Sequence, residues 1–186
     1  RPRRTVVVVA FGAEEAGLQG SAWLCRHGLV PRDSIDAMLN LDTIGVLADD
    51  TLHVGGLGAA APFAALVAAA AADLPLATSR MGWAGGDHVS FLEAGVPALA
   101  LFGGPYPEYN TPDDLPGVID RDDLARVTAF AARLADALRR HDGPLAFTGA
   151  RPADAAAAGG EQHREAWFGT VPAFGGDAAG YAIGEV

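Results

Sequence analysis

The segment Val96–Phe102 reads VPALALF, and the loop GGPYPEYNTPDD follows it. A continuous apolar run of this length predicts a strand that is covered on both faces. Two earlier segments are similar: Thr5–Phe11 is a run rich in valine, and Ile35–Leu41 reads IDAMLNL, although its Met and Leu residues would also suit a helix. The sequence therefore predicts strands at these three segments.

Helical patterns alternate with these strands. In the clearest of them, Arg121–Arg140, apolar residues recur at helical spacing, and Asp120 is placed to cap the first turn. The alternation predicts an α/β domain with three layers (α/β/α) and a mostly parallel central sheet. The other expected elements are helices at Ser21–His27, Ala61–Asp73 and His88–Ala94 and a short strand at Thr51–Val54.

The composition restricts the classes of partner. The formal net charge is −10, and the only basic run is the N-terminal RPRR, so nucleic acid is not expected as a partner. No apolar stretch reaches the roughly 20 residues that a membrane-spanning helix needs. The single cysteine, Cys25, lies in an apolar helical pattern, which is typical of a buried small hydrophobic residue.

The chain divides into three parts. Residues 1–147 carry the alternating pattern, and residues 148–163 are rich in Ala, Gly and Pro, which is typical of a linker. Residues 164–186 regain aromatic and β-forming residues and are expected to begin a second domain. Because a buried-type strand starts within a few residues of Arg1, we expect the first domain to be truncated at its N-terminal side.

Polar side chains follow each of the three expected strands. Glu14 and Glu15 follow the first, Asp42 the second, and Tyr109 and Asn110 lie in the loop after the third. If the strands are parallel neighbours, these side chains meet at one edge, where the carboxylates would need a cation to offset their repulsion. A bound metal ion would also activate water, and a free carboxylate beside it would serve as general base.

A structural interpretation of the same residues stays open at this point. A pair of glutamates after a strand is common in solvated loops and at helix N-termini, and Asp42 alone could cap a turn. The spacing of the carboxylates does not decide between the two interpretations.

Several separated motifs, in order, resemble the M28 family of zinc aminopeptidases. The segment VAFGAEEAGLQGS resembles the glutamate motif of that family, and LNLDTIG resembles its aspartate ligand motif. The segment GGDHVSFLEAGVPALALF is similar to its Ser-Asp-His segment and the strand after it, and PEYNTPDD is similar to its Tyr-His-Thr-Pro-Glu-Asp stretch. The resemblance covers roughly residues 6–141.

The resemblance implies a role for each matching residue. It makes Glu14 the general base, and it makes Glu15 and Asp42 zinc ligands. It makes Tyr109 a phenol donor to the oxyanion of the tetrahedral intermediate.

The same resemblance assigns two further residues and excludes others. Asp87 and His88 would line or brace the site. The remaining histidines match no motif and are expected to be surface or packing residues: His27, His53, His141 and His163.

Two departures from the family pattern limit the expected metal site. The family has upstream His and Asp ligands, which would lie before Arg1, so two zinc ions per complete site are expected but this chain holds an incomplete set. Asn110 stands where the family has its late His ligand. A neutral amide oxygen is a poor zinc donor beside imidazole, so we expect this position to be weakened, occupied by a harder ion or empty.

The expected function is hydrolysis of N-terminal residues from peptides that have a free N-terminus. One alternative is a catalytically silent relative that binds peptides or partner proteins, and another is a glutaminyl-cyclase-like acyl transferase. The doubled glutamate of GAEEAG counts against the cyclase. The tail from residue 164 resembles the start of a PDZ-like domain, and relatives with that domain imply a periplasmic or secreted location.

Overall fold

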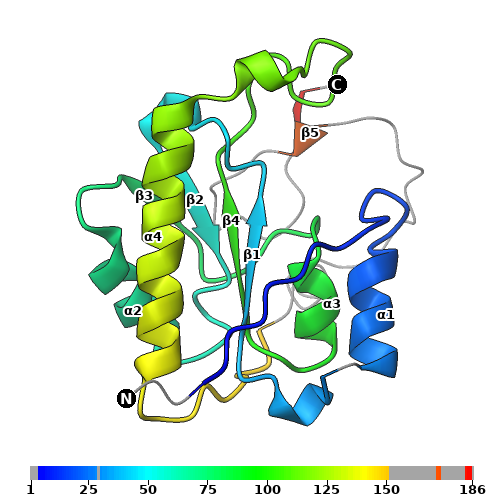
Figure 1. Ribbon diagram of the computed structural model, residues 1–186, viewed down its shortest axis with the longest axis vertical. Coiled ribbons are helices and arrows are strands. Elements are labelled where there is room, and N and C mark those ends of the chain that lie inside the picture. Colours follow the sequence, from blue (N-terminus) through cyan, green and yellow to red (C-terminus); the bar gives the residue numbers. More distant parts are fainter. Residues whose placement is uncertain (1–3, 29, 151–170, 173–182, 186) are drawn as a thin grey trace.

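The computed structural model describes residues 4–28, 30–150, 171–172 and 183–185. Its main sheet has the strand order β1-β4-β2-β3 (Figure 1). β4 pairs parallel with β1 and antiparallel with β2, and β2 pairs parallel with β3. The sheet is therefore mostly parallel, as predicted, and its strands are β1 (Met38–Asp42), β2 (Leu52–Gly55), β3 (Leu76–Thr78) and β4 (Ala98–Phe102).

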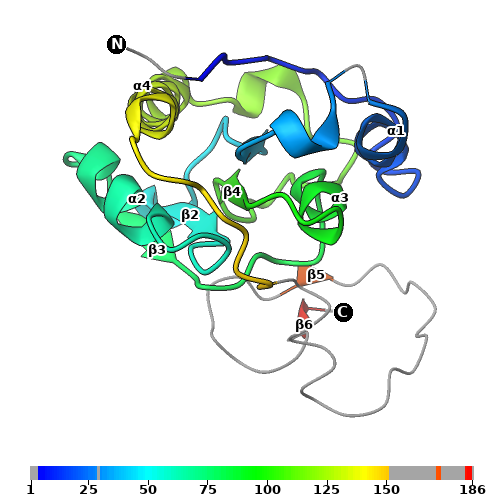
Figure 2. The same cartoon turned by 90° about the horizontal axis from the view of Figure 1, so that it is seen from below.

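Helices cover both faces of this sheet, which gives the predicted three layers. Figure 2 shows α2 and α4 on one side of the strands and α1 and α3 on the other. α2 packs against α4, and α1 packs against α3. Because both faces are covered, every residue of β4 is buried. The helices are α1 (Gln19–His27), α2 (Phe63–Ala71), α3 (His88–Glu93) and α4 (Arg121–Arg140).

α4 has the bounds that the sequence predicts. The Asp120 carboxylate accepts hydrogen bonds from the backbone N–H groups of Asp122 at 2.8 Å and Asp123 at 3.0 Å. These bonds satisfy two of the donors that a helix N-terminus leaves free. The buried face of the helix carries the apolar residues at helical spacing, namely Val127, Phe130, Ala131, Leu134 and Leu138.

The predicted strand at Thr5–Phe11 is wrong. The structure assigns no strand to this segment, and its valines face solvent, with Val8 93% exposed. The preference of valine for strands reflects packing on a paired, half-buried surface, and β1 pairs only with β4 within the described residues. β3 was not predicted, because its three residues are too short to show a period.

The remaining elements agree with the predictions apart from shifts of their ends. Cys25 is partly buried and packs against the hydrophobic core. None of the described helices has the length and apolar character that crossing a membrane requires. Short 3-10 turns also occur at Arg32–Ser34, Ala48–Asp50 and Pro116–Val118.

The predicted linker and second domain lie mostly outside the described residues. Of residues 164–186 the structure describes two short strands, β5 (Val171–Pro172) and β6 (Ile183–Glu185), which pair antiparallel. The division at residues 148–163 and the PDZ-like assignment stay predictions.

Gly103 holds together the loops that follow β1 and β4. Its N–H donates to the carbonyl of Thr43 at 3.0 Å, and its carbonyl accepts from the N–H of Ala48 at 2.7 Å. A Cβ atom at this position would lie 1.9 Å from the carbonyl oxygen of Val46. Only glycine permits two backbones to approach this closely.

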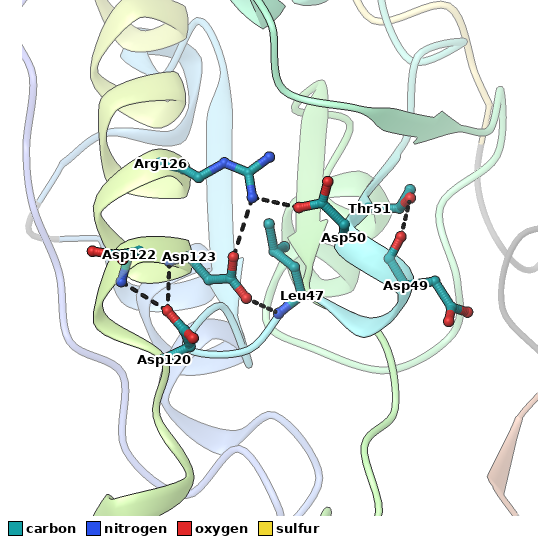
Figure 3. A network of polar contacts seen from close by, with 8 residues as sticks. All are labelled: Leu47, Asp49, Asp50, Thr51, Asp120, Asp122, Asp123 and Arg126. Carbon is teal, nitrogen blue, oxygen red and sulfur yellow. Dashed lines mark hydrogen bonds and ion pairs between the residues drawn. The ribbon is translucent and has the colours of Figure 1, made fainter.

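The loop after β1 is also attached to the first turns of α4 (Figure 3). The Leu47 N–H donates to Asp123 Oδ2 at 3.0 Å. Arg126 donates to Asp123 Oδ1 at 3.2 Å and forms an ion pair with Asp50. One carboxylate therefore connects the loop backbone to the helix, and the guanidinium group connects the helix to the end of the loop.

Substituting Gly103→Ala is expected to lower the free energy of unfolding by about 1–3 kcal/mol, because the added methyl group forces the two loops apart. Gly117→Ala is the matched control, because a Cβ atom there would meet nothing within 4 Å. Urea denaturation followed by circular dichroism measures both variants. Equal stability of the two variants would contradict the close approach at Gly103.

Substituting Asp123→Ala is expected to cost about 1–3 kcal/mol, because it leaves the Leu47 N–H without its acceptor and Arg126 with one partner fewer. Asp122→Ala removes a carboxylate from the same helical turn and therefore matches the loss of charge near the helix N-terminus. Thermal unfolding of the two variants gives the comparison. A cost at Asp122 as large as that at Asp123 would show that the loop contact contributes nothing.

Candidate functional site

Glu14 and Glu15 lie in a tight loop that leads into α1. The Leu18 N–H donates to the Glu14 carbonyl at 2.8 Å, and the Gln19 N–H donates to the Ala13 carbonyl at 3.1 Å. Ala13 and Leu18 both have a φ of 57°, in the left-handed region. The loop therefore presents the glutamates side by side without a strand before them.

Asp42 and Tyr109 come together because β1 and β4 are parallel. Asp42 is the last residue of β1 and lies opposite Phe102, the last residue of β4. The loop after Phe102 returns so that the rings of Phe102 and Tyr109 pack edge to face, 6.0 Å between centroids. The Thr43 hydroxyl donates to Asp42 Oδ1 at 3.2 Å.

Asp87 and His88 are buried at the start of α3. Asp87 is 8% exposed, and its Oδ1 has no hydrogen-bond partner among the described residues. His88 Nε2 donates to the carbonyl of Trp83 at 3.1 Å, so Nε2 carries the hydrogen and Nδ1 is left as a bare acceptor. Burial lowers the pKa of His88 to about 4, and the bond to Trp83 opposes this shift, so the ring is neutral at neutral pH. This environment suits the bracing role expected for His88.

The carboxylates lie near enough to influence one another. Burial raises the pKa of Glu14 above its ordinary value, and the charges of Glu15, Asp42 and Asp87 raise it further. A hydrogen bond from the backbone of Gly86 opposes these effects. Glu14, Glu15 and Asp42 therefore share one electrostatic environment, and Asp87, expected only to line or brace the site, belongs to it as well.

Tyr109 belongs to the same electrostatic environment. Burial raises the pKa of its phenol, and the negative charges of Asp42, Glu15 and Glu14 add to this effect, whereas a hydrogen bond with the Asn110 side chain opposes it. The phenol therefore keeps its proton at neutral pH and can donate a hydrogen bond.

The described residues do not form a complete set of ligands for a metal ion. Across residues 4–28 and 30–150, no group of three or more His, Cys, Asp or Glu side chains is placed to hold one. Glu15 and Asp42 have the oxygen donors that zinc accepts, whereas Asn110 is exposed and neutral, with a left-handed φ of 58°. The described residues therefore do not make up a metal site by themselves, although Glu15 and Asp42 have oxygen donors of the type that zinc accepts.

A row of aromatic rings beside the carboxylates was not predicted. Trp83 packs against His88 at 5.7 Å and against Phe102 at 6.0 Å, and Tyr106 packs against Tyr109 at 5.7 Å. The sequence carries a signal for Trp83, since it lies four residues before Asp87 in MGWAGGDH. No local pattern shows that these rings meet.

Comparison with known proteins finds one family and several solved structures. The model of peptidase family M28 matches residues 1–135. The chain is similar to LapA aminopeptidase from Legionella pneumophila, with 22% identity, a TM-score of 0.61, and coverage of 72% of this chain and 38% of LapA. It is similar to BSAP, a zinc aminopeptidase from Bacillus subtilis, with 25% identity, a TM-score of 0.60, and coverage of 76% and 38%.

A third structure, an aminopeptidase from Aneurinibacillus sp. strain AM-1, has 29% identity and a TM-score of 0.57 over 74% of this chain and 34% of its own. A search of the curated proteins finds no match. The chain spans between 34% and 38% of the length of these three relatives. Because the family model covers most of the sequence and the fold agrees, the chain belongs to peptidase family M28.

Proposed function

We propose that the protein containing this chain is a zinc-dependent aminopeptidase that removes N-terminal residues from peptides. The observation that carries the proposal is the mutual influence of Glu14 and Glu15, in the loop before α1, with Asp42 at the end of β1 and Tyr109 in the loop after β4. Functional groups of open α/β sheets gather at such strand ends. Membership of a peptidase family and similarity to zinc aminopeptidases support the same reaction.

Glu15 and Asp42 are the residues of this chain that would hold a zinc ion. A bound zinc ion would act as a Lewis acid and lower the pKa of a water molecule. The negative charges of Glu15, Asp42 and Asp87, which add to burial in raising the pKa of Glu14, support a cation here. The other ligands of a complete site, for two ions, would come from outside this chain.

Glu14 would act as the general base. Its raised pKa lies nearer to neutral pH than that of an ordinary glutamate, so it can take a proton from water and return it to the leaving amine. The backbone of Gly86 bonds to the Glu14 side chain, and Gly86 itself is buried. This contact would hold the carboxylate in one orientation during both transfers.

Tyr109 would stabilise the negative charge that develops on the carbonyl oxygen of the peptide. Its phenol is half-buried and protonated, so it offers a fixed donor that needs little reorganisation. The surrounding carboxylates also suit the positive charge of a free peptide N-terminus. Attraction of that amine would favour removal of terminal residues over cleavage within a chain.

Asn110 supports a second candidate, a silent relative that binds peptides without hydrolysing them. Its neutral side chain is exposed and bonds to Tyr109, and it offers zinc only a weak donor. The two candidates share a peptide ligand and differ in turnover.

Hydrolysis of leucine p-nitroanilide by the full-length zinc-loaded protein tests the proposal. We expect turnover that a chelator abolishes and zinc restores, and Glu14→Gln is expected to lower kcat by about 10²–10⁴-fold, because general-base catalysis is lost. Glu93→Gln, an exposed glutamate at the end of α3, is the matched control and is expected to keep full turnover. Peptide binding without turnover by the unsubstituted protein would favour the silent relative, and full turnover by Glu14→Gln would remove Glu14 from the mechanism.

A further inference from the structure

An open cavity of about 330 Å³ lies between the loops that follow β1 and β4. One wall comes from the residues directly after Asp42, and the other from the loop after Phe102 and the turn that precedes α4. The residues that matter for the argument are Thr43, Val46, Tyr106, Asp114, Leu115 and Ile119.

The cavity is next to the candidate site, because a residue on each of its two walls contacts a residue of that site. Thr43 lines it, and its hydroxyl donates to Asp42 Oδ1 at 3.2 Å. Tyr106 lines it as well, and its ring packs edge to face on Tyr109, 5.7 Å between centroids. Two of the lining residues therefore contact residues of the candidate site directly.

The lining combines an apolar surface with one carboxylate. Leu115 is 60% exposed and Ile119 is 46% exposed, so both offer apolar surface to a ligand. Asp114 lies beside them and accepts hydrogen bonds from the Tyr106 hydroxyl at 3.0 Å on Oδ1 and 3.1 Å on Oδ2. The contact with the Tyr106 hydroxyl holds the Asp114 carboxylate in one position where it lines the cavity. It leaves the carboxylate as a negatively charged group.

We propose that this cavity is a subsite for a lysine or arginine side chain of the substrate, at one of the two residues that flank the scissile bond. The aliphatic stem of such a side chain covers Leu115 and Ile119, and its cationic end reaches Asp114. The inference rests on the proposed function, because it takes a peptide bound at Asp42 and Tyr109 as its starting point. It adds a preference for a basic side chain, which the proposed function does not contain.

The test compares lysine with norleucine, which has the same aliphatic stem without the charge. The substrates are the dipeptide amides Lys-Leu, Nle-Leu, Leu-Lys and Leu-Nle, hydrolysed by the full-length zinc-loaded protein. We expect a higher kcat/KM for lysine than for norleucine at one of the two positions. Asp114→Asn is expected to lower this ratio by about threefold to fivefold, the size typical of an exposed ion pair.

Asp113→Asn is the matched control, because it removes the neighbouring exposed charge without touching the cavity. The lysine-to-norleucine ratio of this variant is expected to match that of the unsubstituted protein. An equal fall of the ratio in both variants would overturn the subsite in favour of general attraction by the acidic surface. Equal kcat/KM for lysine and norleucine at both positions would also overturn it.

A binding measurement keeps the inference testable if the protein hydrolyses nothing. The same amides are titrated into the ¹⁵N-labelled protein, and the amide signals of Thr43, Tyr106 and Ile119 are followed by NMR. Larger shifts with lysine than with norleucine, reduced by Asp114→Asn, would support the subsite even where the peptidase proposal fails. Equal shifts, or no shift at these residues, would overturn it.

Discussion

Repulsion among carboxylates at one edge of the sheet is the constraint on which the site depends. Burial raises the pKa of Glu14, and the charges of Glu15, Asp42 and Asp87, which come from three separate segments, raise it further. Gathering like charges in a partly buried place costs free energy. Among the described residues, a hydrogen bond from the backbone of Gly86 to Glu14 offsets part of this cost. A cation bound among them would remove this cost, and the proposed chemistry follows from that requirement.

The fold keeps these groups in place through backbone contacts more than through side chains. Parallel pairing of β1 with β4 sets Asp42 beside Phe102, and Gly103 then ties the two following loops together. Asp123 joins the first of these loops to the long helix α4. The loop after β1 is therefore attached both to the loop after β4 and to α4, which suits a site that must hold a peptide in one orientation.

The sequence predicts those parts of the molecule whose signals are local or periodic. The capping residue Asp120 and the helical spacing of apolar residues predict the bounds of α4 correctly. The continuous apolar run predicts correctly that β4 is a fully buried strand. Thr5–Phe11 failed as a strand because a strand needs a paired neighbour, which no local pattern reports. Glu14 nevertheless lies near enough to Asp42 for the charge of Asp42 to raise its pKa. The loop contact at Gly103 and the packing of Trp83 on Phe102 were missed, since they join residues far apart in the chain.

Calorimetric titration of zinc into the metal-free full-length protein tests most directly whether these carboxylates form part of a cation site. We predict that this protein binds zinc and that Asp42→Asn weakens the binding at least about tenfold, because a carboxylate donor is lost. Asp33→Asn, which removes an exposed carboxylate paired with Arg32, is expected to leave the affinity unchanged. Absence of zinc binding, or equal affinity in Asp42→Asn and the unsubstituted protein, would contradict the account.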